Sequence, residues 1–371
     1  MDRRKFLSFA AAATPAHLVA AAGRIPAYRV VTSHKPVSSS VPGPFPGRVA
    51  SVRSERCIDA ETDKVDRDKV TEMVAAGMKA LTGEQNTRAA WSRFFDSSDV
   101  VGIKINASGA PNICSAPEVV GEVAANLVAV GVRPDNIWVY ERNKIQVDTV
   151  PYAAHLPAGA HVVTADAWLG YDPFTYVDVS FFGEDDTRSN IVRLVSDKLT
   201  KIVNIPNMKD HGASGVTGCL KNIAYGSFGN VARSHQYTDT HTLSFIATLA
   251  AVEPLRSRTV LHINDGLRGI WHGGPFMHQK RFRFYPKQML FSTDPVASDR
   301  LLIDIIEAKR AAEKAISVWD RSEESLGRKS EFASNPNANS FKREPGHIEY
   351  AGKLGLGVYD KAKIDLREIV L

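Results

Sequence analysis

Short apolar segments alternate along the chain with longer segments in which apolar residues recur every three or four positions. The short segments are typical of buried strands, and the longer spacing is typical of helices with one buried face. We predict strands at 100–105, 136–140, 161–164, 201–205, 259–263 and 288–291, and helices at 63–81, 119–130, 240–251 and 295–310. Because strands and helices alternate, we expect an α/β fold, a mostly parallel sheet with helices on both faces.

Two helix starts carry their own signals. Ser115-Ala-Pro-Glu118 has the spacing of a capping box before the helix at 119–130. Asp294 followed by Pro295 is typical of an N-cap and a first helical residue. These two signals predict where the flanking loops end.

Three regions depart from this alternation. Residues 171–197 predict a small β excursion with a hairpin, and residues 319–349 predict a polar C-terminal insertion or lid. Residues 23–55 are rich in Pro and Ser and predict an extended lead-in. We therefore expect a single α/β domain over 56–371.

The first 22 residues have the pattern of a signal peptide. Asp2-Arg3-Arg4-Lys5-Phe6-Leu7-Ser8 is followed by a short apolar stretch that ends in small residues at Ala22. Paired arginines before Phe-Leu are typical of the twin-arginine export machinery, and the apolar stretch is too short and Ala-rich for a stable membrane span. We expect a periplasmic or otherwise exported protein, cleaved near Ala22. This route carries folded proteins, often ones already loaded with a cofactor.

Composition narrows the classes of function. The formal charge is +5, of which the first residues supply +2, and the remaining charges are interspersed, so we expect no nucleic-acid partner. The three cysteines Cys57, Cys114 and Cys219 are far apart and cannot supply an iron–sulfur cluster. They allow one disulfide after export, with the pair left open. The chain contains no Gly-x-Ser-x-Gly motif, so its sequence gives no support for a serine nucleophile.

Polar residues gather near the carboxyl ends of the predicted strands. In a parallel sheet these ends share one edge, where ligands bind in a crevice. Asn and Asp also end strands simply because they favour turns, but lysine is not a turn former. We therefore predict ligand-binding residues along this edge at Lys104, Asn106, Glu141, Lys209 and Asp265.

The segment from Asn204 to Gly226 does not have the pattern of core. A strand, a glycine-containing loop and a helix-like segment follow one another, an order that lets backbone N–H groups converge on an anion. The spacing matches neither the P-loop nor the dinucleotide fingerprint. We predict His211 and Lys221 as catalytic residues, with ligand contacts from Gly215, Thr217, Gly218 and Asn222.

Histidines are concentrated in the same half of the chain. A metal site from His211, His235 and Asp265 is a second hypothesis, although a single histidine is more often a hydrogen-bonded structural residue. No His-Glu-x-x-His or His-x-His pattern is present. The metal and any cofactor therefore stay unidentified at this level.

Several segments together resemble a known family. Val101-Gly-Ile-Lys-Ile-Asn106, Asn204-Ile-Pro-Asn-Met-Lys-Asp-His211, Gly215-Val-Thr-Gly-Cys-Leu-Lys-Asn222 and Ser292-Thr-Asp-Pro-Val-Ala-Ser-Asp299 are similar to the family called domain of unknown function 362, over about residues 98–305. The resemblance implies an α/β domain, and many members carry twin-arginine signals. Some relatives also have ferredoxin-like cysteine motifs, which this chain lacks.

A local similarity points to more specific chemistry. His211, Gly215-Val-Thr-Gly-Cys-Leu-Lys221 and Gly226 are spaced as in the loop of the nickel-pincer lactate racemase family. That resemblance implies a covalent cofactor on Lys221 and an acid/base role for His211. Cys219 and Tyr225 depart from the glycine and the proline of that family's loop.

These observations predict an exported protein with an anion- or cofactor-binding crevice for a small anionic ligand. If the protein is an enzyme, His211 moves a proton and a lysine holds the anion or a covalent adduct. A non-catalytic periplasmic binding or cofactor-carrier protein would use the same crevice. A metal-pincer-type racemase or isomerase is the further alternative.

Overall fold

The computed structural model describes residues 25–37, 41–327 and 329–371. The predicted signal peptide at 1–22 lies outside the described residues. Among the described residues, no helix has both the length and the apolar character that crossing a membrane requires.

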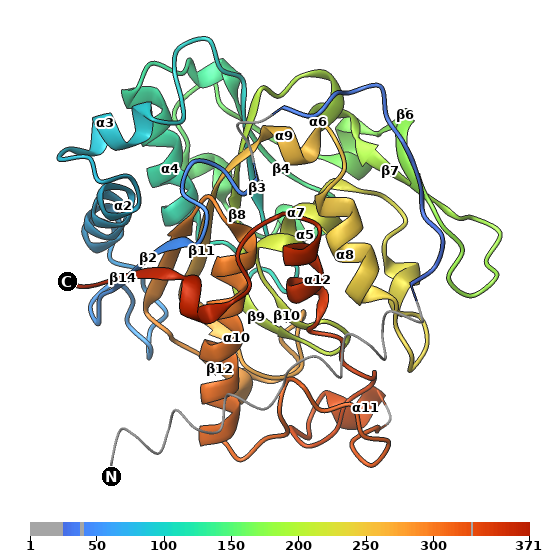
Figure 1. The fold of residues 1–371 in the computed structure, drawn as a ribbon. Coiled ribbons are helices and arrows are strands. Elements are labelled where there is room, and N and C mark those ends of the chain that lie inside the picture. Colours follow the sequence, from blue (N-terminus) through green and yellow to red (C-terminus); the bar gives the residue numbers. More distant parts are fainter. Residues whose placement is uncertain (1–24, 38–40, 328) are drawn as a thin grey trace.

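A large mixed sheet forms the centre of the molecule (Figure 1). Its main path has the order β14-β2-β13-β11-β8-β3-β4-β5, and β9, β10 and β12 complete the 11 strands. From β11 to β5 all neighbours on this path are parallel, whereas β13 is antiparallel to both β11 and β2. The predicted α/β fold is therefore confirmed. The strands are β2 (Arg48–Arg53), β3 (Val101–Ile105), β4 (Ile137–Glu141), β5 (His161–Thr164), β8 (Lys201–Ile205), β9 (Asn207–His211), β10 (Gly215–Thr217), β11 (Thr259–Ile270), β12 (Arg283–Phe284), β13 (Gln288–Ser292) and β14 (Asp365–Val370).

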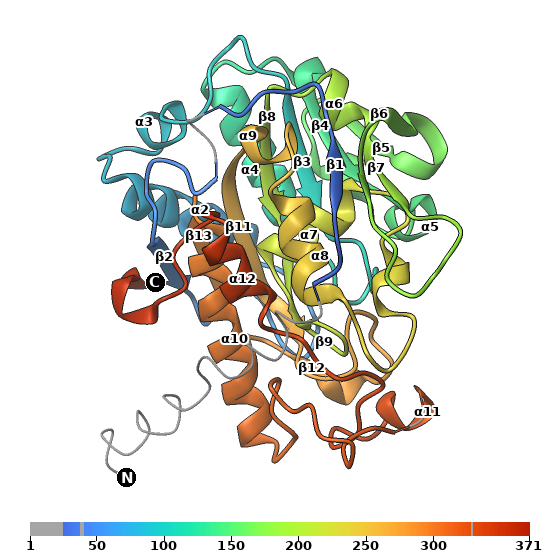
Figure 2. The same cartoon turned by 45° about the vertical axis from the view of Figure 1, so that its right-hand side comes forward.

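Helices cover both faces of this sheet, and each face has its own hydrophobic core (Figures 1 and 2). One core packs under α2 (Arg67–Thr82), α3 (Thr87–Ser92) and α4 (Pro117–Ala129). The other packs under α7 (Cys219–Ser227), α8 (Thr242–Ala250), α10 (Pro295–Ala312) and α12 (His347–Lys353). Successive side chains of β8 point into different cores, Ile202 into the second and Val203 into the first, because side chains alternate between the two faces of a strand.

The β excursion forms a separate small sheet. β6 (Tyr171–Asp178) and β7 (Arg188–Val192) make the predicted antiparallel hairpin, and β1 (Arg29–Val31) adds to its edge. β1 and β2 both fall inside the range expected to be an extended lead-in, so part of that range belongs to the folded sheets. The remaining helices are short: α5 (Lys144–Val147), α6 (Arg193–Asp197), α9 (Leu255–Arg258) and α11 (Lys329–Phe332).

The segment from Asn204 to Gly226 differs most from its prediction. It is not an open loop: β9 and β10 form an antiparallel hairpin and α7 follows at once, with every residue buried. The prediction that this segment lies outside the core was therefore wrong. The cause is tertiary, since α8, α10 and the polar insertion at 319–349 pack over it.

The two predicted helix starts had different outcomes. Asp294 caps α10, and its carboxylate accepts from the amide of Ala297 at 2.9 Å. The capping box before α4 does not form, because the hydroxyl of Ser115 donates instead to the carbonyl of Ile205 at 2.6 Å. The amide of Ala116 is bound by Asp265 of the neighbouring strand, at 2.7 Å.

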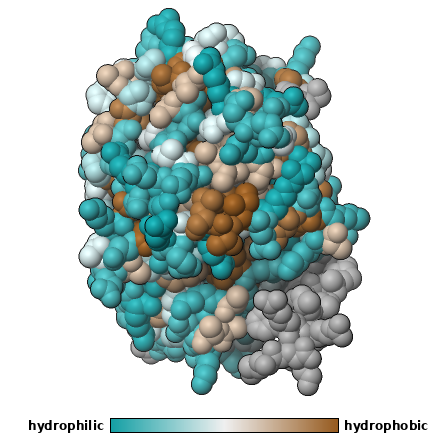
Figure 3. Space-filling model, turned by 90° about the vertical axis from the view of Figure 1, so that its left-hand side faces the viewer, coloured by the Kyte–Doolittle hydropathy of each residue, from teal (hydrophilic) through white to brown (hydrophobic). Residues whose placement is uncertain are grey.

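The surface of the molecule is polar over most of one face. The face that carries the C-terminus is mostly polar, with a compact apolar patch near its centre and smaller apolar areas around it (Figure 3). The edge strand β14 carries exposed apolar side chains at Leu366 and Val370.

All three cysteines are buried with free thiols, so no disulfide joins any pair of Cys57, Cys114 and Cys219.

Candidate functional site

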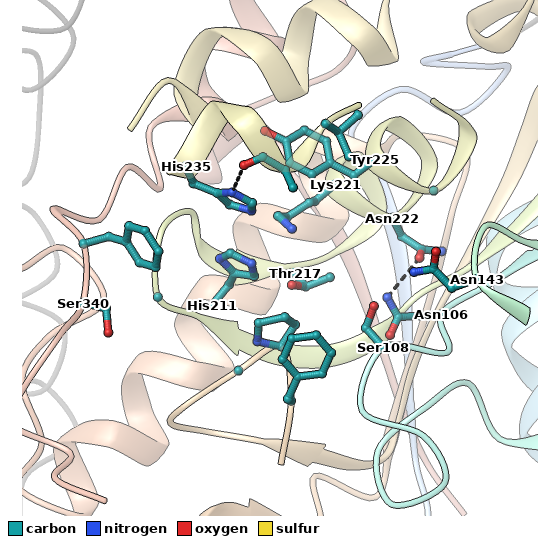
Figure 4. A pocket seen from close by; sticks show the side chains of 18 of the residues that line it. Asn106, Ser108, Asn143, His211, Thr217, Lys221, Asn222, Tyr225, His235 and Ser340 are labelled. Carbon is teal, nitrogen blue, oxygen red and sulfur yellow. Dashed lines mark hydrogen bonds between the residues drawn. The ribbon is translucent and has the colours of Figure 1, made fainter. Parts of the chain in front are cut away.

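A cavity of about 780 Å³ opens at the carboxyl ends of β3 and β4 and beside the β9–β10 hairpin. This is the crevice position expected for an α/β sheet. Figure 4 shows His211 and His235 on one side, the asparagines on the other, and the amine of Lys221 between them. Of the predicted site residues, those that line the cavity are Asn106, Glu141, His211, Thr217, Lys221, Asn222 and His235.

Lys221 projects into this cavity from the buried helix α7. Its amine has no hydrogen bond or ion pair within the described part of the chain, and it lies 4.6 Å from the ring centroid of Tyr225. Burial, reinforced by the nearby Arg142, lowers the pKa of Lys221 to about 7. Arg142 lines the same cavity, and its guanidinium donates to the carbonyl of Phe228 at 3.2 Å. Among the described residues, neither cation has a carboxylate partner, so both are available to an anionic ligand.

His211 and His235 lie with their rings nearly parallel and the centroids 5.7 Å apart. Nδ1 of His211 faces the amides of Ala213 and Ser214 at 3.1 and 3.3 Å. An amide only donates, so Nδ1 is the acceptor and the neutral ring carries its hydrogen on Nε2. Burial and the Lys221 charge hold the pKa of His211 well below its ordinary value, so this ring presents an N–H donor.

His235 has the opposite arrangement. Its Nδ1 lies 2.5 Å from the carbonyl of Ala232, and because a carbonyl only accepts, Nδ1 carries the hydrogen. The lone pair is then on Nε2, and burial together with Lys221 lowers the pKa of His235 to about 4. The two histidines therefore supply one hydrogen-bond donor and one proton acceptor. His211, the predicted acid/base residue, thus presents an N–H donor, whereas His235 presents a lone pair that can accept a proton.

Thr217 and the asparagines complete the polar wall. The hydroxyl of Thr217 is buried and has no partner among the described residues, so it is available to a ligand. Asn106 donates to the side-chain oxygen of Asn222 at 3.1 Å, and Asn222 donates to Asn204 at 2.8 Å. These contacts fix the orientation of the asparagine side-chain amides on the side of the cavity opposite the two histidines.

Lys104 lies behind the wall instead of in the cavity. It is fully buried in β3 and pairs with Glu141 at 2.7 Å. Gly226 permits this pairing, because a Cβ there would lie 1.9 Å from Cε of Lys104. The role of Lys104 is therefore to hold Glu141 and the nearby Asn222, at 3.4 Å, in place.

Lys209 is also behind the wall. Its amine donates to the side chain of Asn106 at 2.5 Å and to the carbonyls of Ser108 and Ile113. Burial lowers the pKa of Lys209 to about 7. Since Asn106 and Ser108 line the cavity, Lys209 positions a wall and does not face a ligand.

The predicted backbone anion site is already taken by a protein group. Asp299 of α10 accepts from the first amides of α7, those of Cys219 at 2.6 Å and Leu220 at 2.9 Å. A Cβ on Gly218 would lie 2.1 Å from the Asp299 carboxylate, so glycine is needed there for this contact. Asp299 of α10 therefore already accepts hydrogen bonds from the backbone amides at the start of α7, where an anionic ligand was expected.

Gly215 and Asp265 also have structural roles. Gly215 has φ +76° in the hairpin and packs closely on Pro345. Asp265 lies in the middle of the long strand β11 and is bound to Ala116 and Leu267, so it does not end a strand. Burial raises the pKa of Asp265 to about 6.

The proposed triad of metal ligands does not assemble. Within the described residues, no three His, Cys, Asp or Glu side chains lie close enough to hold a metal ion together. His211 and His235 are neighbours, whereas Asp265 is engaged at the start of α4. A metal held by these three residues therefore has no support from the arrangement.

The sequence prediction missed Arg142 and a set of aromatic residues that line the cavity. Arg142 follows the predicted Glu141 directly, so the same strand-end argument could have found it. The other group is aromatic and comes from distant segments, and no local pattern brings it together: Tyr225, Tyr237, Phe276, Phe332 and Phe341.

A buried charge cluster lies next to His211. Asp210 pairs with Arg343 at 2.5 Å and with Arg310 at 3.4 Å, so two cations share one carboxylate. Nε and Nη2 of Arg343 have no partner among the described residues. The net positive charge of this cluster adds to that of Lys221 and Arg142 and favours an anion in the cavity.

Comparison with known proteins agrees with this architecture at the level of the family. The comparison with curated proteins gave no match. The model of the family described as domain of unknown function (DUF362) matches residues 101–304, which span β3 to α10 and include His211 and Lys221. This match covers more than half of the 371 residues, and the chain therefore belongs to the DUF362 family.

Proposed function

We propose that this protein binds a small organic anion in the cavity and moves a proton on it. The observation that carries the proposal is the buried amine of Lys221, which has no partner in the described chain. It lies near a second cation, Arg142, which has no carboxylate partner among the described residues. Burying a cation without a partner is costly, and such groups gather at functional sites.

Each wall of the cavity has a part in the proposed chemistry. Lys221 and Arg142 hold the anionic group, while the Nε2 hydrogen of His211 and the hydroxyl of Thr217 donate to it. Nε2 of His235 accepts a proton from the ligand, and Lys221 and His211 stabilise the negative charge left behind. A bound anion raises the pKa of His235 towards its ordinary value, which strengthens it as a base.

Binding measurements on matched lysine variants test the first half of this proposal. Calorimetry with inorganic phosphate and a panel of small carboxylates should give binding to the unaltered protein and none to Lys221→Met. Lys363→Met, at an exposed lysine far along the chain, should bind as the unaltered protein does. If both variants bind equally, Lys221 is not the anion site.

Catalysis and simple binding differ in one measurable step. The rival function is a non-catalytic periplasmic binding or cofactor-carrier protein with the same cavity. Ligand that binds should exchange a C–H proton with D₂O, measured by NMR, and His235→Gln should bind equally well but lose the exchange. Binding without any exchange in the unaltered protein would favour the carrier.

A covalent cofactor on Lys221 is the second candidate function. It is favoured by the pKa of about 7, because an appreciable share of the amine is then neutral and nucleophilic near neutral pH. The local similarity to the lactate racemase family suggests the same lysine. Intact mass and metal content of protein purified from its native source test this candidate, and an unmodified mass without metal would reject it.

We also propose export by the twin-arginine route, on the basis of Arg3 and Arg4. Replacing both by Lys should keep the uncleaved protein in the cytoplasm, as measured by cell fractionation and by mass. Export that continues unchanged in this double variant would contradict the proposal.

A further inference from the structure

We infer that the ligand is an organic anion that carries an aromatic ring beside its charged group. This inference rests on the proposed anion-binding function and adds the chemical class of the ligand. The observation behind it is a set of aromatic side chains that line the same cavity as Lys221 and Arg142, namely Tyr225, Tyr237, Phe276, Phe332 and Phe341, here called the aromatic wall.

The size of the cavity excludes a small ion as its full occupant. A volume of about 780 Å³ lies in the range, roughly 300–1,000 Å³, of pockets that bind drug-sized molecules. A single phosphate or acetate held by Lys221 would leave most of this space to water. The ligand therefore has a body as well as a charged group.

Aromatic side chains from separate segments line the space for that body. Tyr237 and Phe276 are 59% and 47% exposed, so they are large apolar surfaces open to the cavity or its mouth. Phe341, from the polar insertion, lies 6.0 Å from His235 by ring centroids. Rings placed in this way stack against a planar apolar group, which would cover surface that is otherwise exposed to water.

The charged groups fix which end of the ligand lies where. Phe341 packs beside His235, and His235 lies beside His211 and near Lys221. Two of the aromatic rings, those of Phe341 and Tyr225, are therefore adjacent to the anion-binding groups, and Figure 4 shows Tyr225 beside Lys221. An aromatic ring attached close to the carboxylate or phosphate fits this arrangement.

Calorimetry with matched pairs of probes tests the inference. The pairs are acetate with phenylacetate and inorganic phosphate with phenyl phosphate, which separates carboxylate from phosphate ligands. The aryl member should bind at least about tenfold more tightly, because it buries its ring as well as its charge. The neutral analogue 2-phenylacetamide should bind more weakly than phenylacetate.

Variants of the aromatic residues test whether the tighter binding of the aryl probes depends on the aromatic wall. Phe276→Leu combined with Tyr237→Leu should remove most of the aryl advantage, and both side chains are exposed enough to be replaced without loss of the fold. Phe174→Leu is the control, because Phe174 is 77% exposed on β6 and outside the cavity. Lys221→Met should weaken both members of each pair.

The outcomes separate this inference from the proposed function. If small anions bind through Lys221 but the aryl members bind no more tightly, the inference is wrong and the anion site stands. If 2-phenylacetamide binds as well as phenylacetate, the inference is also wrong. If neither member of either pair binds, the proposed function and the inference both fall.

Discussion

Lys221 is a cation that the fold buries without a partner among the described residues, and this single residue links stability to the proposed function. Its pKa of about 7, against an ordinary value of 10.5, means that the unfolded chain holds the proton more tightly than the folded one. Lys221 therefore lowers the free energy of unfolding. This loss of stability is complete below pH about 7, shrinks as the pH rises, and vanishes above the ordinary lysine pKa. Groups that cost stability in this way are typical of binding sites.

Replacing Lys221 by Met should therefore stabilise the protein while abolishing anion binding. We expect a higher melting temperature than that of the unaltered protein below pH about 7, with the difference shrinking as the pH rises towards the ordinary lysine pKa of 10.5. Thermal unfolding at a series of pH values measures this. A variant that is less stable at every pH would show that Lys221 has a structural role.

Anion binding should weaken as the pH rises through about 7, because only the protonated amine of Lys221 attracts the anion. Above that pKa the affinity should fall about tenfold for each pH unit. His211 stays neutral in this range, since its pKa is well below its ordinary value. Calorimetry across the range gives the profile, and Lys221→Arg, which keeps its charge, should flatten it.

Gly226→Ala should destabilise the protein by about 1–3 kcal/mol, as overpacking in a core does. The added Cβ would lie 1.9 Å from Cε of Lys104 and would displace that side chain from Glu141. Helix propensity alone predicts that Gly226→Ala stabilises the protein, since Ala favours the helical conformation of α7 more than Gly does. Chemical denaturation decides between them, with Gly346→Ala as control, where the one close atom is the flexible end of Leu243.

At the scale of elements, α7 is a helix of nine residues with no exposed face. A short helix this deeply buried needs an internal partner for its first amides, because no water reaches them. Asp299 from α10 is that partner, and it ties the start of α7 to a helix 80 residues away in sequence. The position of Lys221 therefore depends on α10.

Asp299→Asn should destabilise the protein by about 1–2 kcal/mol, since an amide accepts only one of the two hydrogen bonds and sets an N–H against the other. It should also weaken anion binding by disturbing the start of α7. Chemical denaturation and calorimetry measure the two effects. Asp148→Asn, at an exposed ion pair on α5, should change neither quantity.

At the scale of the whole molecule, the polar insertion closes one side of the cavity, and the buried pairing of Arg343 with Asp210 anchors it. Arg310 of α10 shares the same carboxylate, and it also donates to the carbonyl of Pro336 at 3.2 Å. The hairpin, α10 and the insertion are thus held together by one acidic residue.

Asp210→Asn should cost about 3–5 kcal/mol, because it leaves two buried arginines without a counter-charge. It should also speed proteolysis within the insertion, which loses its anchor. Denaturation and limited trypsin digestion test these effects. Glu313→Gln breaks an exposed pair on α10 and should leave both measurements unchanged, and a similar loss in the two variants would contradict the role of Asp210.

The sequence alone determined the elements whose signals are local. Val101–Ile105 and Ile137–Glu141 are continuous apolar runs, and Asp294 with Pro295 marks the start of α10, so neighbours within a few residues suffice to predict them. The strand-end argument also placed Asn106 and Glu141 at the cavity. Family membership follows from segments of this kind, because their order and spacing are properties of the chain itself.

Only the tertiary structure decided what those segments do. The glycines, Lys209 and Asp265 have the residue types of a binding loop, but Asp299, Pro345 and the backbone around α4 already occupy their contacts. The roles of the two histidines depend on which backbone group meets each Nδ1, a choice that the folded chain makes. Contacts across tens of residues leave no periodic signal in the sequence, so burial and partner choice emerge only when the sheet, α10 and the insertion are assembled.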